Sequence, residues 1–484
     1  MEGWRRLVAD YRSGVGGRSD GADGADGADG ADDADDADDG GRREARAEPA
    51  PDGDRDAWLA ATLPVLDLAL GSVAALCSAA RRAGATGPLT ARGPSPARVA
   101  ASFGSDRLLR LDGRPVPGFA PLSGFFRTGD GWVRTHANYP HHRARLLHLL
   151  GLPDGADRDD LVARLAHASA ATLEDDAAAA GAVVARVRTE AAWRSSAPGR
   201  AAHDGPLVRL RAREDISPGP AALAGGPAPL AGVRVLDLTR VIAGPVATRA
   251  LAALGADVLR VDPPVPAEIR HQHLDVGQGK RTTLLDLHDA GDRRRAQTLL
   301  DDADVLVTGY RPGALDRFGL VPPPGAVVAR VSAWGDVGPW AGRRGFDSIV
   351  QAASGVALVE SPDGDTPGAL PAQALDHATG YLLAAGVVDA LGARGADGRG
   401  RDVTAALART AAWLLDADGR DPARPPAAVP GPGSVVSHGH RPRVTTARPA
   451  LPGLDDHPAP ASPWGSDHAA WSDPSDPSDP SAPR

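Results

Sequence analysis

Apolar and polar positions follow a regular pattern in the second half of the chain. Short apolar runs alternate there with segments in which apolar residues recur at helical spacing. The predicted strands are 233–238, 258–261, 305–307 and 327–331, and the predicted helices are 247–254, a segment near 293–300 and segments beginning at Asp347 and Thr379. Buried strands separated by helices are typical of a parallel sheet with helices on both faces, so the pattern predicts an α/β fold.

The first half of the chain has a different pattern. Its apolar spacing is mainly helical, but the turn Gly129-Asp130-Gly131 separates two strand-like runs within 125–133 and predicts a hairpin. A linker rich in Gly, Pro and Ala follows, and both ends of the chain are low in complexity and are expected to be disordered. The predicted organisation is an acidic N-terminal segment (1–57), a small, lid-like α+β domain (58–217), a linker (218–228), the α/β domain (229–415) and a C-terminal tail rich in Pro, Gly and Asp (416–484).

The charge of the chain is unevenly distributed. The net charge is −9, but ten aspartates lie between Asp20 and Asp39, and without them it would be +1. The repeated Gly-Ala-Asp triplets offer no apolar face and repel one another, which favours disorder over a metal-binding cage. Among the basic residues Lys280 is the only lysine, which draws attention to its position.

The most apolar stretch, the N-terminus and the single cysteine bear on where the protein is located. The most apolar stretch, 58–77, is interrupted by Pro64 and Asp67 and does not predict a membrane span. The N-terminus does not resemble a signal peptide, so we expect a cytoplasmic protein with neither a membrane nor a nucleic acid as partner. The single cysteine, Cys77, has apolar neighbours and is expected to be a buried small hydrophobe.

The turn after the first predicted strand decides against a dinucleotide fold. Asp262 ends the second strand at about the position of a ribose-binding carboxylate. The turn itself, Thr239 to Pro245, lacks the spaced glycines that let a backbone close on a pyrophosphate. Nicotinamide or flavin binding is therefore disfavoured, although backbone N–H groups at the following helix could still bind some ligand.

Several segments of this half, in order, resemble the class III CoA-transferases of the CaiB/BaiF type, which include formyl-CoA and carnitine CoA-transferase-like proteins. The matching segments are 229–238, 243–245, 254–258, Gly279-Lys280-Arg281 with 285–287, which is similar to N-K-R-S-x-x-x-D-L, and 303–319, which is similar to N-F-R-P-G-x-x-x-R-L-G. The resemblance implies a Rossmann-like sheet, an acyl-CoA and a carboxylic acid as substrates, and a homodimer. It covers about 185 residues.

The resemblance also implies where CoA would bind. A CoA site needs cations for its phosphates and an apolar slot for adenine. The residues that match the family's CoA-contacting positions are Ile242, Ala243, Lys280, Arg281, Gly309, Tyr310 and Arg317. The plainer alternative is that the cations are solvated, and Gly309 replaces the asparagine that the family has at one contact.

The candidate nucleophile is Asp376, within a segment that resembles the family's G-D-x-x-T-G. In the family this aspartate forms a mixed anhydride with the acyl group and then an aspartyl thioester with CoA, so no metal or organic cofactor beyond CoA itself is implied. At a helix start, nearby N–H groups could receive the oxyanion, but the same position also suits a simple helix cap.

The histidines of the chain and Phe346 help to distinguish a transferase from the other candidate functions. His377 follows Asp376 directly, but neighbours on a helix point apart, which argues against a dyad. His136, His141 and His142 lack the further ligands of a metal site and are interpreted as structural. α-Methylacyl-CoA racemases of this superfamily have a histidine where Phe346 stands, and this favours a transferase over a racemase unless another part of the chain supplies a base.

Two departures from the family pattern favour a third interpretation. The hairpin at 125–133 resembles part of the family's small domain but here precedes the α/β half, and the glycine-rich lid loop has no good counterpart, since 431–434 is a poor match. A lid excludes water from the reactive anhydride. The alternative to a transferase is therefore a catalytically degenerate CoA-binding or interaction protein, with a racemase-like enzyme as a further one.

Overall fold

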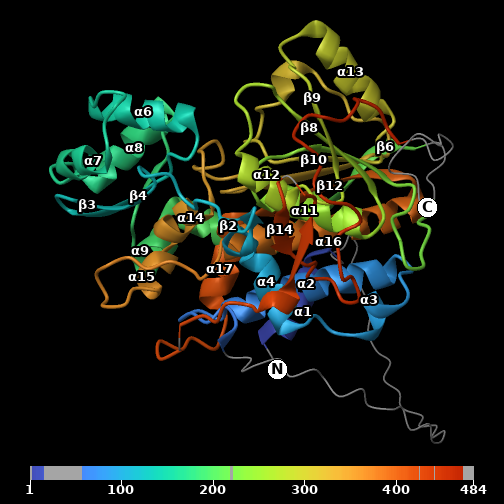
Figure 1. Ribbon diagram of the computed structural model, residues 1–484, viewed down its shortest axis with the longest axis horizontal. Helices are drawn as coiled ribbons and strands as arrows, with labels where there is room; N and C mark the ends of the chain where they lie inside the picture. Colours follow the sequence, from blue (N-terminus) through green and yellow to red (C-terminus); the bar gives the residue numbers. More distant parts are fainter. Residues whose placement is uncertain (1–2, 16–56, 218–221, 425, 441, 473–484) are drawn as a thin grey trace, which may run out of the picture.

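The computed structural model describes residues 3–15, 57–217, 222–424, 426–440 and 442–472. Its centre is a seven-stranded sheet with the strand order β6-β12-β11-β10-β7-β8-β9 (Figure 1). In chain order these strands are β6 (Val208–Ile216), β7 (Arg234–Leu238), β8 (Asp257–Asp262), β9 (Arg281–Leu284), β10 (Val305–Thr308), β11 (Val327–Ser332) and β12 (Arg399–Ala406). All neighbouring strands are parallel except β6 and β12. The α/β fold predicted from the alternating pattern is confirmed.

Helices cover both faces of this sheet because its strands are apolar on both sides. In β7, Val235 packs into the larger core with α11 (Ala243–Ala253) and α16 (Ala374–Asp397), whereas Leu236 packs into a second core with α13 (Ala290–Asp301). Successive side chains of a strand point to opposite faces, so a continuous apolar run is what two covered faces require. The elements predicted for this half are present, and α16 begins before the predicted Thr379.

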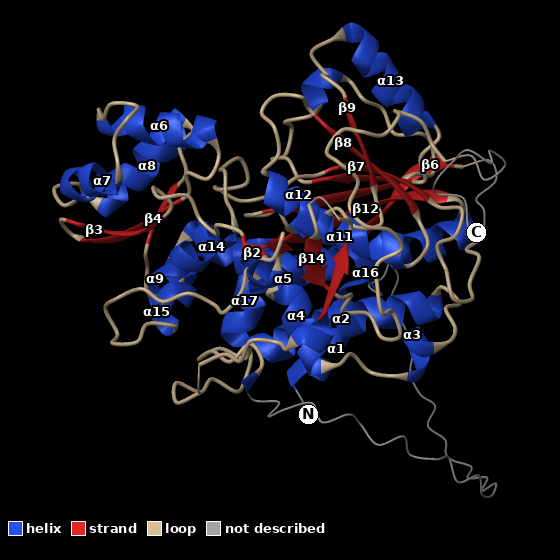
Figure 2. Ribbon diagram, viewed as in Figure 1, coloured by secondary structure: helices blue, strands red, loops and turns tan. Residues whose placement is uncertain are grey.

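A separate small domain contains the predicted hairpin (Figure 2). The antiparallel strands β3 (Gly124–Thr128), β4 (Gly131–Thr135) and β5 (Val184–Arg186) form its sheet. Three helices complete it, namely α6 (Pro140–Leu150), α7 (Arg158–Leu165) and α8 (Ala170–Ala180), and together these elements enclose a core of their own. Three short helices connect it with the main sheet: α9 (Glu190–Ser195), α10 (Ala197–His203) and α14 (Asp347–Ser354).

The packing of the helices in the first half does not follow the predicted boundaries of the small domain, 58–217. Helix α2 (Val65–Arg82) packs along α16 and belongs to the larger core, as does α4 (Pro96–Phe103). Helix α1 (Gly3–Val15) lies on α2 and buries Leu7 and Tyr11. The expectation of disorder is therefore wrong for residues 3–15, because an amphipathic helix gains stability from a partner that the local sequence does not reveal. The acidic repeat lies outside the described residues.

The C-terminal region, predicted to be a disordered tail, also contains ordered structure. Strands β13 (Val435–His438) and β14 (Val444–Ala447) form a small sheet with β1 (Arg110–Leu111) and β2 (Arg114–Pro115). Beyond it, residues 459–472 run beside the edge strand β9, where the Asp467 N–H donates to Thr282 O at 2.8 Å and the Asp467 carboxylate accepts from the Thr282 N–H at 2.7 Å. This segment covers a sheet edge that would otherwise be unpaired.

Most of the remaining helices are short, and the helix Leu407–Asp416 is buried in the larger core. They are α3 (Pro88–Ala91), α5 (Ser105–Leu108), α12 (Arg270–Val276), α15 (Val356–Val359), α17 (Leu407–Asp416) and the 3-10 turns η2 (Asp316–Phe318) and η3 (Pro432–Ser434). Within the described part of the chain, no helix is both long enough and apolar enough to span a membrane.

Candidate active site

A cavity of about 490 Å³ opens at the carboxyl ends of the parallel strands. Residues at or just after the ends of five strands line it: Leu238, Asp262, Leu285, Gly309 and Ser332. The chain crosses from β7 to β8 on one side and returns to β10 on the other, and ligands of open α/β sheets bind at such a switch point. We call this space the large cavity.

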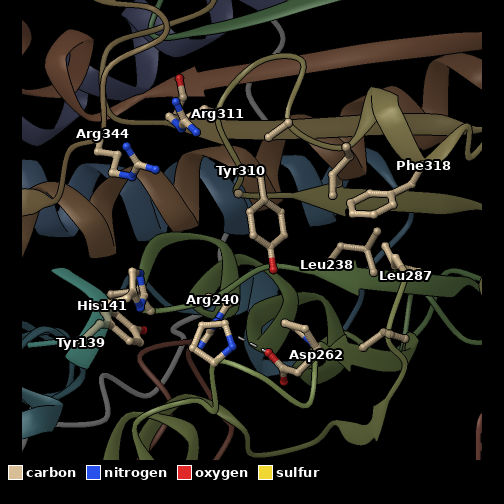
Figure 3. A pocket seen from close by; sticks show the side chains of 18 of the residues that line it. Tyr139, His141, Leu238, Arg240, Asp262, Leu287, Tyr310, Arg311, Phe318 and Arg344 are labelled. Atoms are coloured by element: carbon tan, nitrogen blue, oxygen red, sulfur yellow. Dashed lines mark ion pairs between the residues drawn. The ribbon is translucent and has the colours of Figure 1, made fainter. Parts of the chain in front are cut away.

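The two sides of the large cavity differ in chemistry (Figure 3). Leu238, Leu287 and Phe318 form an apolar side, and the guanidinium of Arg317 lies 4.7 Å from the centre of the Phe318 ring. Arg311 and Arg344 lie together on another side. None of these three arginines has a carboxylate within ion-pair distance among the described residues. The cavity thus offers an apolar slot and cations that are not neutralised.

Tyr310 and Arg240 lie between these sides (Figure 3). Burial raises the pKa of the Tyr310 hydroxyl to about 12, so this group remains a neutral hydrogen-bonding group. Arg240 is not free, because it pairs with Glu268 at 3.4 Å and its guanidinium lies 5.2 Å from the centre of the Tyr139 ring. Arg240 therefore holds the small domain against the main sheet.

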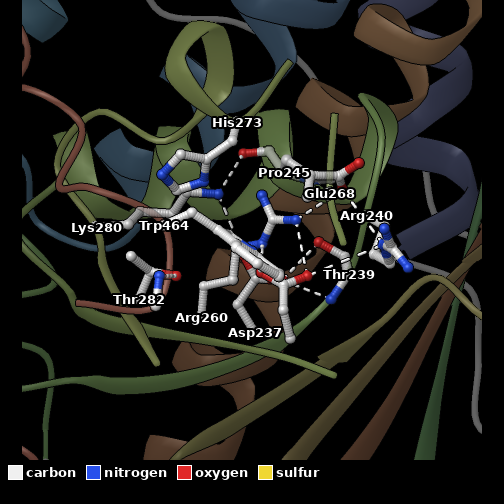
Figure 4. Close-up of polar contacts among 12 residues, drawn as sticks. Asp237, Thr239, Arg240, Pro245, Arg260, Glu268, His273, Lys280, Thr282 and Trp464 are labelled. Carbon is white, nitrogen blue, oxygen red and sulfur yellow. Dashed lines mark hydrogen bonds and ion pairs between the residues drawn. The ribbon is translucent and has the colours of Figure 1, made fainter. Parts of the chain in front are cut away.

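Glu268 is the centre of a buried network that shapes the turn after β7 (Figure 4). It accepts hydrogen bonds from the Tyr139 hydroxyl at 2.7 Å, from Arg260 at 2.8 Å and from the Val241 N–H at 3.3 Å. Burial alone would raise its pKa, but Arg260 and Arg240 outweigh burial and lower the pKa to about 2. Val241 has φ +72°, a left-handed conformation that a β-branched residue rarely adopts, and the network holds it there.

Val241 and Phe346 join the large cavity to a second, smaller one. This smaller cavity has a volume of about 60 Å³, and its lining includes Ile242, Gln373 and Asp376. Val241 and Phe346 line both cavities. We call the smaller space the aspartate chamber.

Asp376 lies in the first turn of α16 in an unusual electrostatic setting. Burial raises the pKa of its carboxyl group well above the usual range, and the nearby carboxylate of Asp347 raises it further. Burial likewise raises the pKa of Asp347 to about 6. Two buried carboxyl groups that repel each other favour a state in which at least one of them is protonated.

The N-terminal N–H groups of α16 do not face Asp376 as the sequence suggested. The Asp376 N–H donates to Asp347 Oδ2 at 3.0 Å, and the Asp347 side chain also accepts from the backbone of Leu375. Asp347 therefore caps α16, and these N–H groups are not available for an oxyanion. This role of Asp347 was not predicted from the sequence.

Lys280 is buried among polar groups of β7 and α11 (Figure 4). Its Nζ contacts Asp237 Oδ2 at 3.2 Å, Thr248 Oγ1 at 2.9 Å and the Pro245 carbonyl at 3.2 Å. Burial lowers the pKa of Lys280 to about 8. The only lysine thus supports the first turn of α11 from inside the core and lines neither cavity, and its contact with CoA stays a prediction.

Arg281 also lies away from both cavities. It pairs with Asp257 at 2.9 Å and donates to the Ala470 carbonyl at 2.6 Å, which ties the C-terminal segment to the sheet edge. Ile242 lines the aspartate chamber, and Ala243 is buried at the start of α11 without lining either cavity. Gly309, Tyr310 and Arg317 line the large cavity.

The histidines divide between a structural role and the cavity walls. His377 is buried, with its ring centre 5.2 Å from that of Phe103, and lines neither cavity. His141 and His142 line the large cavity, and His136 lines the aspartate chamber, stacked on Phe346 at 3.7 Å. Within the described part of the chain, no group of His, Cys, Asp or Glu side chains is arranged to hold a metal ion.

The cover of the aspartate chamber comes from an unexpected part of the chain. Residues 116–119, which follow β2, line the chamber, whereas 431–434 do not. Phe119 is held there by the guanidinium of Arg134, 4.6 Å from the centre of its ring. Arg311 lines the large cavity but was not among the predicted CoA contacts, although its Arg-Pro-Gly segment at 311–313 could have indicated it. The chamber cover and Asp347 had no such indication in the sequence, because distant segments bring them to the site.

Comparison with known proteins shows what this half of the molecule is similar to. The model of CoA-transferase family III matches residues 230–435. This part of the chain is therefore similar to that family, and the match covers less than half of the chain. The acetyl-coenzyme A transferase nodX of Hypoxylon pulicicidum is 36% identical over 204 residues, which are 39% of this chain and 34% of that protein. The acetyl-CoA:oxalate CoA-transferase of Acetobacter aceti is 33% identical over 221 residues, 40% of this chain and 57% of that protein.

The family III match is confined to part of each protein. A crystal structure of a CaiB/BaiF family protein from Brucella suis is 26% identical, with a TM-score of 0.36 over 39% of this chain and 55% of that one. The chain spans between about a third and just over a half of the length of the relatives named here. Both cavities contain residues of the matched segment 230–435 together with residues that precede it, such as Tyr139 and His136.

Proposed function

We propose that this protein is a CoA-transferase that moves CoA between carboxylic acids, with Asp376 as the nucleophile. One observation carries the proposal: Asp376 lines a chamber that joins, at Val241 and Phe346, a cavity with an apolar slot and unneutralised arginines. CoA would occupy the large cavity, with adenine beside Phe318 and its phosphates near the arginines. The thioester would then reach Asp376 through the junction.

In the proposed reaction the ionised Asp376 attacks the thioester carbonyl, and CoA leaves as the thiolate, which gives an acyl-aspartyl anhydride. The thiolate attacks the aspartyl carbonyl of the anhydride and releases the donor carboxylate, which leaves an aspartyl-CoA thioester. An acceptor carboxylate attacks this thioester and expels the thiolate, and the thiolate attacks the acceptor carbonyl of the new anhydride. The products are a new acyl-CoA and the free Asp376 carboxylate.

Asp347 and the cover formed by 116–119 have supporting roles in this proposal. Because burial and Asp347 raise the pKa of Asp376, its carboxyl group must lose its proton before attack, while Asp347 holds the start of α16 through the Asp376 N–H. The cover limits the access of water to the anhydride, which water would otherwise hydrolyse.

The test is intact-protein mass spectrometry after incubation with a panel of acyl-CoAs, followed by treatment with hydroxylamine. We expect an acyl or CoA adduct that hydroxylamine removes and that Asp376→Ala does not form. Asp397→Ala, at the far end of α16, is the matched control. CoA binding without an adduct for any donor would instead indicate a degenerate CoA-binding protein.

A second candidate function is exchange of the α-proton of an acyl-CoA. The observation in its favour is that His136 lines the chamber beside Asp376, although Phe346 occupies the expected histidine position. Burial lowers the pKa of His136 to about 3, which keeps the ring neutral and makes it a weak base. Incorporation of deuterium from D₂O into a 2-methylacyl-CoA, lost in His136→Gln, would favour this function over CoA transfer.

A further inference from the structure

The proposed attack of Asp376 on a thioester creates an oxyanion that needs a hydrogen-bond donor. When an Asp376 oxygen bonds to the thioester carbon, the π electrons of the carbonyl group move to its oxygen. The first N–H groups of α16 are bonded to Asp347, so they do not receive this charge. A protein donor for the oxyanion would therefore come from another part of the chamber wall.

His136 is the one buried side chain with an N–H group among the described residues that line the aspartate chamber. It is 5% exposed. The other lining side chains with N–H groups are partly exposed, namely Asn138, His271, Gln272 and Gln373. A donor that is shielded from water and fixed in place stabilises an oxyanion more strongly, because no solvent competes for it and it need not reorient during the reaction. Burial therefore favours His136 over the other donors.

The ring of His136 is held in place without the use of its nitrogen atoms. It stacks on Phe346 with 3.7 Å between the ring centres and 7° between the planes, and the His142 ring lies edge-on with its centre 6.1 Å away. Nδ1 is fully enclosed without a hydrogen-bond partner, and Nε2 is not enclosed in this way. Since a buried N–H without an acceptor is rare in proteins, the proton of the neutral ring belongs on Nε2. His136 thus combines a fixed orientation with an unused donor.

The charge state of His136 is that of a donor and not of a base. Burial, and after it the nearby Arg134, lower the pKa of His136 to about 3, so the ring is neutral near pH 7. A neutral imidazole still donates one hydrogen bond, and it can polarise a carbonyl group without giving up its proton.

Phe346 places His136 at the junction of the two cavities. Phe346 lines both cavities, and His136 lies on the chamber side with Asp376. With CoA in the large cavity, the thioester would pass this junction to reach Asp376. His136 directly follows β4 of the small domain, whereas Phe346 and Asp376 belong to the matched segment 230–435. The small domain would thus supply a group for the reaction that the matched segment does not contain.

We propose that His136 is the oxyanion donor for the attack of Asp376 on the thioester. This inference rests on the proposed function as a CoA-transferase and adds a second catalytic residue to it. As the bond from Asp376 to the thioester carbon forms, the negative carbonyl oxygen accepts a hydrogen bond from the His136 N–H. The carbonyl then re-forms while the C–S bond breaks, and CoA leaves as the thiolate with the electron pair of that bond. No proton is transferred, and His136 is neutral before and after the step.

The experiment measures the single-turnover rate at which the full-length protein forms the Asp376 adduct, by rapid quench and intact mass spectrometry. The probe is the acyl-CoA of the panel that labels the wild type fastest. His136→Phe keeps an aromatic ring on Phe346 but removes the donor, and we expect it to slow the adduct about 100- to 1,000-fold. His136→Gln retains an N–H group and should recover part of the rate. The dissociation constant of CoA, measured by isothermal titration calorimetry, should be unchanged in both variants, because free CoA has no thioester carbonyl.

His377→Phe is the matched control. His377 is also buried, packs on the Phe103 ring and has an enclosed Nδ1 without a partner, but it lines neither cavity. Its substitution should leave the adduct rate unchanged. A wild-type rate in His136→Phe, or equal slowing in His136→Phe and His377→Phe, would overturn the role of His136 and leave the proposed function standing. No adduct in the wild type with any donor would overturn the proposed function itself, and this inference with it.

Discussion

Asp237 and Asp376 are both buried aspartates of the same domain, and their surroundings are opposite. Asp237 accepts hydrogen bonds from Thr239 and Thr248 and pairs with Lys280. Burial alone would raise its pKa, but Lys280 and Arg260 outweigh burial and lower it. Asp376 has no such donors, and both burial and Asp347 raise its pKa.

This difference indicates which of the two buried carboxylates has a structural role and which can act as a nucleophile. A carboxylate surrounded by donors and a cation is stabilised as an anion and is a poor nucleophile, because attack would break those contacts. A carboxylate that lacks them, and that lines a cavity, can react without such a loss. By this criterion the Lys280 motif stabilises the fold, and the Asp376 motif is the candidate for catalysis.

Removal of the buried cation should give the largest effect on stability. Lys280→Met leaves Asp237 buried without its ion-pair partner, and we expect a loss of about 3–5 kcal/mol in the free energy of unfolding. Urea unfolding measures this loss. The matched control is Arg281→Met, whose pair with Asp257 is more exposed and should contribute at most about 1 kcal/mol. Equal losses in the two variants would contradict a structural role specific to Lys280.

The carboxyl pair should make stability depend on pH with a definite sign. The pKa of Asp347 is raised from 3.8 to about 6 in the folded protein, so the folded state binds more protons than the unfolded state in this range. Its contribution to stability is therefore present below about pH 4 and is lost as the pH rises through 6. The loss is on the order of 3 kcal/mol, from about 1.4 kcal/mol for each unit of pKa.

Asp347→Asn tests this prediction, because asparagine can still accept the hydrogen bond from the Asp376 N–H. The variant should lose less stability than the wild type between about pH 4 and 7, as followed by urea unfolding at each pH. Asp237 has the opposite sign, since a lowered pKa stabilises the protein above the usual pKa and this contribution is lost on acidification. Parallel pH curves for Asp347→Asn and the wild type would show that the carboxyl pair does not titrate as described.

The smallest expected effect compares two arginines of the family motifs. Arg317 lines the large cavity without a carboxylate partner, whereas Arg281 is paired away from it. We expect Arg317→Ala to weaken the binding of CoA about tenfold, or about 1.4 kcal/mol, and Arg281→Ala to leave it unchanged. Isothermal titration calorimetry with CoA measures both. Equal weakening by the two variants would contradict the assignment of CoA to the large cavity.

Local pattern was enough to predict the parallel sheet and the position of Asp376 near a helix start. Strands such as β10, apolar on both faces, and helices with regular apolar spacing carry that information in a few consecutive residues. The part played by α1 could not be found in this way, since an isolated amphipathic helix shows its apolar face but not the helix on which it packs. The homodimer and the cytoplasmic location stay predictions.

The sequence by itself determined the fold class, the family resemblance of 229–415 and the candidate nucleophile, because residue type and spacing along one segment are sufficient for each. Only the tertiary structure decided that Lys280 is an internal support, that Asp347 caps α16 beside Asp376, and that 116–119 cover the aspartate chamber. The physical reason is that the role of a charge depends on which distant groups surround it after burial. Spacing along the chain does not contain that information.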